Sequence, residues 1–118
     1  MPKNIIGHFG ENLACAYLQN KNYQILERNY HLGHLELDII SSKDGQIFLF
    51  EIKTRRYLQT KIEETLISKN QIANLKKAAI RYAANQRLNF NLIHFDLILI
   101  ILNYQQNRAQ FKHYRDIF

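Results

Sequence analysis

The stretch from Leu35 to Arg56 reads LELDIISSKDGQIFLFEIKTRR and decides the fold that the sequence predicts. Two runs rich in β-branched and aromatic residues flank Asp44-Gly45, a dipeptide that strongly favours a two-residue hairpin turn. Such a turn sets the register of the two strands that it joins. This register makes two cross-strand pairs of charged residues: Asp38 with Glu51, and Glu36 with Lys53.

Side chains alternate between the faces of a strand, so these four charged side chains are expected on one face of the hairpin. Cross-strand neighbours are about 4.5–5.5 Å apart at Cβ, where two facing carboxylates destabilise a sheet and raise each other's pKa. A divalent cation between Asp38 and Glu51 would relieve both effects, and oxygen donors suit Mg²⁺ or Mn²⁺. The alternative is a solvated face with a Glu36–Lys53 ion pair. The opposite face is apolar and predicts a core of Leu37, Ile39, Phe48, Phe50 and Ile52.

Composition and charge are those of a globular protein with an anionic partner. The chain of 118 residues is 47% hydrophobic and 22% charged, which is enough for one domain with one core. Its net charge of +6 favours nucleic acid as that partner. A single cysteine, Cys15, rules out an intrachain disulfide and a cysteine zinc site. We therefore expect a reducing, cytoplasmic location, since no apolar signal segment or membrane-spanning run is present, and we expect no membrane partner.

The remaining chain predicts helices and strands around this hairpin. Apolar residues at helical spacing predict helices over residues 4–20 and from Ser68, a good N-cap, to about residue 86. Residues 57–66 are expected to be irregular or to hold a short helical turn. Strands are expected at residues 23–30, at 92–102, where both faces are apolar, and at 109–118 on an edge of the sheet. The order predicts an α/β fold with a mixed central sheet of about five strands flanked by helices.

Several further polar residues have both a functional and a structural interpretation. Glu11, in the first helix, is either a solvated carboxylate or a further acidic group of the site. Arg55 and Arg56 extend the polar face of the hairpin with two cations, and Lys69, at the start of the second helix, is a candidate phosphate contact. His94 and Asp96 share a face of the fourth strand, and each is interpreted as a structural polar group.

The string Asp38 … Glu51-Ile52-Lys53 resembles the motif of the PD-(D/E)XK, or restriction-endonuclease-like, nuclease superfamily. The chain is more closely similar to the YraN-like family of small bacterial proteins. Two positions depart from that family's pattern: Leu35 replaces a glycine before Glu36, and Asn22 replaces a glycine before Tyr23. The residues that carry the YraN-like resemblance are Gly10-Glu11, Ala14, Tyr17-Leu18, Tyr23 to Tyr30, Glu36 to Ile40, Asp44-Gly45, Phe50 to Arg55, Lys69, Phe95-Asp96 and Phe118.

The resemblance implies a single nuclease-like domain over residues 1–118 with a restriction-endonuclease-like core, similar to archaeal Holliday-junction resolvases. It implies a metal-dependent endonuclease, a phosphodiester hydrolase acting on DNA or structured nucleic acid, with a homodimer expected by analogy to junction-cutting relatives. Three sets of residues follow: catalytic Asp38, Glu51, Lys53, Glu11 and Glu36; metal-binding Asp38, Glu51 and Glu11, for Mg²⁺ or Mn²⁺; and nucleic-acid-binding Arg55, Arg56 and Lys69.

Two other hypotheses stay open at this point. The same fold can bind nucleic acid, branched DNA included, without cleaving it, which the positive charge and the Leu35 departure motivate. Alternatively, the domain is structural or binds proteins, and then the carboxylates of Glu11, Asp38 and Glu51 would be scattered rather than convergent.

Overall fold

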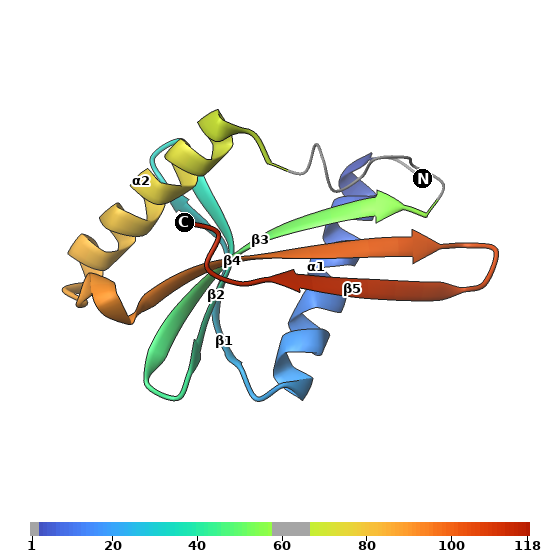
Figure 1. Cartoon of the computed structure of the whole chain (residues 1–118), viewed down its shortest axis with the longest axis horizontal. Coiled ribbons are helices and arrows are strands. Elements are labelled where there is room, and N and C mark those ends of the chain that lie inside the picture. Colours follow the sequence, from blue (N-terminus) through green and yellow to red (C-terminus); the bar gives the residue numbers. More distant parts are fainter. Residues whose placement is uncertain (1–2, 58–66) are drawn as a thin grey trace.

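The computed structural model describes the backbone of residues 3–57 and 67–118 and the side chains from residue 7 onward within these ranges. Figure 1 shows a twisted sheet with one helix on each side. The order of elements is the predicted one, helix, three strands, helix, two strands. The elements are α1 (Lys3–Asn20), β1 (Gln24–Leu32), β2 (Leu35–Lys43), β3 (Gln46–Arg56), α2 (Lys69–Gln86), the 3₁₀ turn η2 (Phe90–Leu92), β4 (Ile93–Asn103) and β5 (Arg108–Tyr114).

The five strands form one mixed sheet, as predicted, and their order in the sheet is β1-β2-β3-β4-β5. Strands β3 and β4 are parallel, and the other neighbouring pairs are antiparallel. Parallel neighbours need a crossover connection, and α2 lies on the connection between them. The irregular segment or short helical turn predicted for residues 57–66 belongs to this connection. Residues 58–66 lie outside the described part of the chain.

The Asp44-Gly45 turn is confirmed together with the register that it sets. Both residues have positive φ, 52° and 77°, as a two-residue hairpin turn of this kind requires. The ladder between β2 and β3 runs from Lys43 opposite Gln46 to Ile39 opposite Phe50. Local turn chemistry therefore determines which residues of the two strands face each other.

The two helices cover opposite faces of the sheet. On the α1 face, Leu18 packs with Phe50, Ile98 and Ile100. On the α2 face, Leu75 and Ala79 pack with Leu49 and Phe95. Nearly all of β4 is buried, as the apolar run on both of its faces predicts. In the described part of the chain, no helix combines the length and the apolar composition that crossing a membrane requires.

Helix α1 approaches β3 closely at Gly10. A Cβ atom at position 10 would lie 1.9 Å from the Thr54 Oγ1 atom, so only glycine fits this crossing. The helix ends before Asn22, which adopts the left-handed conformation (φ 70°) that is common at helix exits. Glu11, the residue after Gly10, therefore lies in the helix where α1 crosses β3.

Helix α2 begins at the predicted N-cap, Ser68. The Gln71 N–H donates to the Ser68 side chain, and the Ser68 N–H donates to the Gln71 side chain, which together form a capping box. The final strand is shorter than predicted, since β5 ends at Tyr114 and not at residue 118. The chain leaves the sheet because Asp116 has a positive φ of 48° and its N–H donates to the Asp96 carboxylate.

Candidate functional site

The predicted acidic face lies where β2 and β3 separate. Beyond Ile39 and Phe50 the Asp38 carboxylate takes the place of a backbone partner, because its Oδ2 accepts a hydrogen bond of 2.8 Å from the Ile52 N–H. Strand β1 bends at the matching point, since Asn29 has φ 50° between the paired residues on either side of it. In Figure 1 the far end of the β1–β2 hairpin lies behind α2, whereas β3 continues toward the N-terminal end of α1.

A cavity of about 260 Å³ opens between this fork and α2. Three of the predicted catalytic carboxylates line it, namely Glu36, Asp38 and Glu51. Glu36 is exposed, whereas Asp38 and Glu51 are half-buried, so the cavity is deeper at the latter two. Its other lining residues are His34, Leu35, Gln71, Asn74 and Leu75.

The Asp38 and Glu51 carboxyl groups act on each other. Burial and then the neighbouring Glu51 carboxylate raise the pKa of Asp38 to about 7, although the Ile52 N–H opposes this shift. Burial also raises the pKa of Glu51, against the Lys53 ammonium and a hydrogen bond with Asp38, both of which lower it. The two groups are therefore in hydrogen-bond contact, and the scattered arrangement expected of a purely structural domain is not found for this pair.

Lys53 is paired differently from the sequence interpretation. Its Nζ lies 3.2 Å from the Glu51 Oε1, with only 16% of the Lys53 side chain and 17% of the Glu51 side chain exposed. The solvated alternative paired Lys53 with Glu36, and that pairing is wrong. Residues two apart on a strand point to the same face, and the fork moves β2, and Glu36 with it, away from this part of β3. Lys53 consequently stays beside the carboxylate that is predicted to bind metal.

Glu11 is half-buried, so it is not the fully solvated carboxylate that was one of its two interpretations. Its Oε1 is buried and has no hydrogen-bond partner in the described part of the chain. Its charge also contributes to the raised pKa of Asp38. Such an unpartnered buried oxygen is rare because it gives up solvation without compensation. The structure therefore adds a fourth acidic group, from α1, to the electrostatic environment of the fork.

The three predicted cationic contacts lie outside the cavity lining. Arg55 donates to the Thr54 carbonyl oxygen at 3.0 Å, and the Arg56 guanidinium lies over the Tyr104 ring, 5.8 Å from its centroid. Lys69 is the first residue of α2 and is exposed. The structure thus leaves Arg55 and Arg56 at the end of β3 and Lys69 at the start of the helix that covers the cavity.

Two lining residues, Gln71 and Asn74, were not anticipated. Both are on the first turns of α2, and one of them has a sequence signal: Ser68 and Gln71 have the spacing of a capping box, which places position 71 on the first turn. That signal locates the residue on the helix. It does not show which part of the sheet the helix covers, and so the cavity could not be inferred from it.

The oxygen donors of the fork suit a divalent cation. In the described part of the chain, no three His, Cys, Asp or Glu side chains stand ready as a complete metal site. However, the carboxyl groups of Asp38 and Glu51 are in contact, and the buried Glu11 oxygen lacks a partner among the described residues. Hard oxygen donors with mutually raised pKa values fit Mg²⁺ or Mn²⁺, because a cation favours their charged forms.

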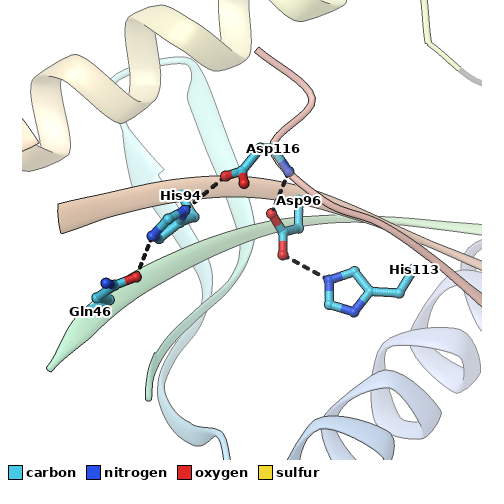
Figure 2. A network of polar contacts seen from close by, with 5 residues as sticks. All are labelled: Gln46, His94, Asp96, His113 and Asp116. Atoms are coloured by element: carbon cyan, nitrogen blue, oxygen red, sulfur yellow. Dashed lines mark hydrogen bonds and ion pairs between the residues drawn. The ribbon is translucent and has the colours of Figure 1, made fainter. Parts of the chain in front are cut away.

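A second polar cluster lies on the α1 face of the sheet (Figure 2). The buried Asp96 accepts from His113 Nε2 at 2.7 Å and from the Asp116 N–H at 2.9 Å. His94 contacts the Asp116 carboxylate at 2.7 Å and the Gln46 side chain. Asp96 and His94 are thus satisfied structural groups, as interpreted from the sequence, and His113 is the partner that the sequence did not reveal.

Cys15 is unsuited to nucleophilic chemistry. It is buried in α1, and burial raises the pKa of its thiol, so that the reactive thiolate is disfavoured. The acidic fork is therefore the strongest candidate for chemistry within the described residues.

These features define a class: an α/β protein with a five-stranded mixed sheet, a helix on each face and an acidic cavity where two strands separate. The chain belongs to the uncharacterised protein family UPF0102, whose model matches residues 10–100, and the YraN-like resemblance is confirmed at this level. A UPF0102 protein of Syntrophomonas wolfei is 38% identical over 113 residues, which cover 96% of each chain. One of Dictyoglomus turgidum is 36% identical and covers 83% of each chain. The protein FP2501 of Flavobacterium psychrophilum is 33% identical over 98% of this chain and 94% of its own.

Proposed function

We propose that this protein is a metal-dependent endonuclease of the PD-(D/E)XK type that hydrolyses phosphodiester bonds in DNA or structured nucleic acid. The observation that carries the proposal is the contact between Asp38 and Glu51 in a cavity, with Lys53 bound to Glu51. Two carboxylates and an ammonium group together offer metal ligands and a general charge stabiliser within one small site. The single cysteine and this substrate class are consistent with action in the cytoplasm.

Asp38 and Glu51 would hold Mg²⁺ or Mn²⁺, with Glu11 contributing directly or through water. The Ile52 carbonyl is a further candidate donor, because the N–H of the same residue already binds the Asp38 carboxylate. When bound, the metal polarises a phosphoryl oxygen and lowers the pKa of its water. Glu36, exposed at the mouth of the cavity, is suited to binding through a water molecule.

Lys53 has a role that does not depend on metal coordination. Its ammonium group is mostly shielded from solvent and is directed to Glu51 at 3.2 Å. A cation held in this position stabilises negative charge as it develops on phosphate, and a shielded environment strengthens the interaction. Lys53 is therefore proposed to orient the attacking water or to stabilise the charged phosphate.

Recognition is proposed to depend on the phosphate backbone. Arg55 and Arg56 lie at the end of β3 and Lys69 at the start of α2, and each can contact phosphate without reading a base. Shape and charge would then select the substrate, and branched DNA presents several backbones at once. A homodimer would place two such sites on one branched substrate.

The proposal is tested by incubating the purified chain with labelled junction, flap, duplex and single-stranded DNA in the presence of Mn²⁺ or Mg²⁺. We expect cleavage that EDTA stops and that Asp38→Ala or Lys53→Met lowers by about 100-fold or more, since losing one charge-stabilising group has an effect of that order. Glu27→Gln is the matched control, because Glu27 is an exposed carboxylate on β1 outside the cavity. Equal cleavage by wild type and Asp38→Ala would overturn the proposal.

A second candidate is a nucleic-acid-binding module of the same fold that does not cleave. The net charge of +6 and the lack of a ready three-ligand cluster among the described residues favour it. Binding that weakens steeply with salt, yet is unchanged by EDTA and by Glu51→Ala, would support this candidate when no substrate is cut.

A further inference from the structure

The end of the sheet beyond the site carries cations and, in the segment that forms β4 and β5, no acidic residue after Asp96. Arg108 begins β5 at this end, and no Asp or Glu lies between Asp96 and Asp116. The β4–β5 hairpin, which this segment forms, lies beside the end of β3 with its two arginines. This part of the surface is therefore suited to an anionic partner, in contrast to the acidic fork.

Two exposed tyrosines lie at this end of the sheet. Tyr57 is 56% exposed and Tyr104 is 52% exposed. The Tyr57 N–H donates to the Leu102 carbonyl oxygen at 2.8 Å, which holds the end of β3 beside the end of β4. The Arg56 guanidinium lies 5.8 Å from the centre of the Tyr104 ring, a cation–π distance. Exposed aromatic rings next to arginine are the features on which bases stack.

Two hollows flank the β4–β5 hairpin. One, of about 240 Å³, is lined by residues that include Tyr57, Gln106 and Arg108. The other, of about 230 Å³, includes Phe9, Tyr104 and Arg108. The described residues that line these two hollows include no Asp or Glu. They offer apolar and aromatic surface, amide side chains and a shared arginine.

This end is continuous with the proposed active site along one strand. Alternation in β3 puts Glu51, Lys53, Arg55 and Tyr57 on the same face. At about 3.3 Å per residue, Tyr57 lies roughly 20 Å along the strand from Glu51. A nucleic-acid strand leaving the site in this direction would pass from the acidic residue to the cations and then to the aromatic ring.

We propose that the end of β3 and the β4–β5 hairpin bind an unpaired nucleic-acid strand, so that the substrate of the site carries a single-stranded arm. This inference rests on the proposed function for the link to cleavage. The bases stack on Tyr57, on the face of the site, and then on Tyr104, which lies with Arg56 toward the α1 face at the end of the sheet. Arg108, which lines both hollows, and Arg56 contact the phosphates. Stacking tolerates any sequence, because every base has a π face, and a duplex keeps its bases buried in the helix. The surface therefore distinguishes a strand with open bases from a plain duplex.

The binding experiment uses the full chain in EDTA, so that no cleavage is needed. Fluorescence anisotropy measures binding to labelled oligothymidylate and to a labelled blunt duplex of the same length. Tyr57→Leu with Tyr104→Leu removes the π faces but keeps apolar bulk, and it is expected to weaken oligothymidylate binding about fivefold or more, with little change for duplex. A second variant combines Tyr57→Leu with Tyr104→Phe. It is expected to recover most of the affinity for oligothymidylate, since the π face at position 104 returns.

The matched control is Phe90→Leu. Phe90 is also an exposed aromatic residue, with 40% of its surface exposed. Phe90 lies before the start of β4, whereas Tyr104 lies after the end of β4. The 11 residues of β4 separate the two positions by roughly 35 Å. Phe90→Leu is expected to leave both affinities unchanged. Arg108→Gln is expected to lower the salt dependence of oligothymidylate binding by about 0.7 in slope, which corresponds to one phosphate contact.

The outcomes separate this inference from the proposed function. Equal oligothymidylate binding by wild type and the double leucine variant would overturn the inference, whether or not the protein cleaves. A dimer in solution that the double leucine variant loses would also overturn it, because a second copy would then cover this surface. Selective loss of oligothymidylate binding supports the inference, and if Mn²⁺ then gives no cleavage of flap DNA, only the proposed function fails.

Discussion

Two aspartates in the same sheet, Asp96 and Asp38, have opposite surroundings. Asp96 is 1% exposed, and both of its oxygens accept hydrogen bonds, one from His113 and one from the Asp116 N–H. Asp38 accepts one hydrogen bond, from the Ile52 N–H, and its other neighbours are carboxylates. Asp96 is therefore a hydrogen-bonded part of the core. Asp38 lies close to other carboxylates, and a cation would stabilise its charged form.

The difference teaches how to distinguish a structural acid from a functional one. A buried carboxylate whose oxygens accept hydrogen bonds from protein donors stabilises the fold, and it needs no additional ligand. A half-buried carboxylate beside others of the same charge destabilises the metal-free protein, and folds retain such arrangements chiefly at functional sites. The predictions below test each side of this contrast, from the largest expected effect to the smallest.

Asp96→Ala is expected to have the largest effect. It would leave the His113 Nε2 and the Asp116 N–H without their acceptor in the core, and breaking a buried pair in this way lowers the free energy of unfolding by about 3–5 kcal/mol. Urea denaturation measures the change. A loss below about 1 kcal/mol, within the range of an exposed pair, would show that Asp96 is not the structural group described here.

Asp38 is expected to make the metal-free protein less stable as the pH rises. Its pKa is raised in the folded state from 3.8 to about 7, so the folded protein holds this proton more tightly than the unfolded chain. The stabilisation is complete below about pH 4 and is lost as the pH rises through 7. One pKa unit corresponds to about 1.4 kcal/mol, so we expect a loss on the order of 2 kcal/mol after allowing for solvent screening.

The measurement is the difference in unfolding free energy between wild type and Asp38→Asn in EDTA across this pH range. The difference isolates Asp38 from other titrating groups, and the neutral variant should be the more stable protein at pH 8. Mn²⁺ should stabilise wild type at that pH and have a much smaller effect on the variant, because the variant lacks a proposed ligand. A wild type that is the more stable of the two at pH 8 without metal would contradict this side of the contrast.

Gly10→Ala is expected to lower stability by about 1–2 kcal/mol, because the added Cβ meets Thr54 Oγ1 at 1.9 Å and moves the helix that carries Glu11. Its control lies in the same helix: a Cβ at Gly7 meets no atom within 4 Å. Gly7→Ala should therefore stabilise the protein by about 0.5–1 kcal/mol through helix propensity. Thermal unfolding compares the two variants with wild type. A stability change of the same sign in both variants would refute the close crossing at Gly10.

Local chemistry explains which parts of the fold could be predicted. The Asp44-Gly45 turn determined the β2–β3 register, Ser68 determined the start of α2, and the apolar run after Asp96 identified a strand covered on both faces. Each signal involves residues close in sequence. The end of β5 was not predicted, because it depends on a hydrogen bond between the Asp116 N–H and the Asp96 carboxylate. Asp96 lies in β4, and Asp116 follows the end of β5, so the two residues are far apart in sequence.

The sequence by itself determined the order of the elements, the hairpin and the two residues, Asp38 and Glu51, that meet across it. Only the tertiary structure decided that Lys53 pairs with Glu51 and not with Glu36, that one oxygen of Glu11 is buried, and that α2 covers the cavity. The physical reason is range. Turn type and alternation act over a few residues, whereas the partners of a charged side chain depend on how a sheet bends and on which helix packs against it.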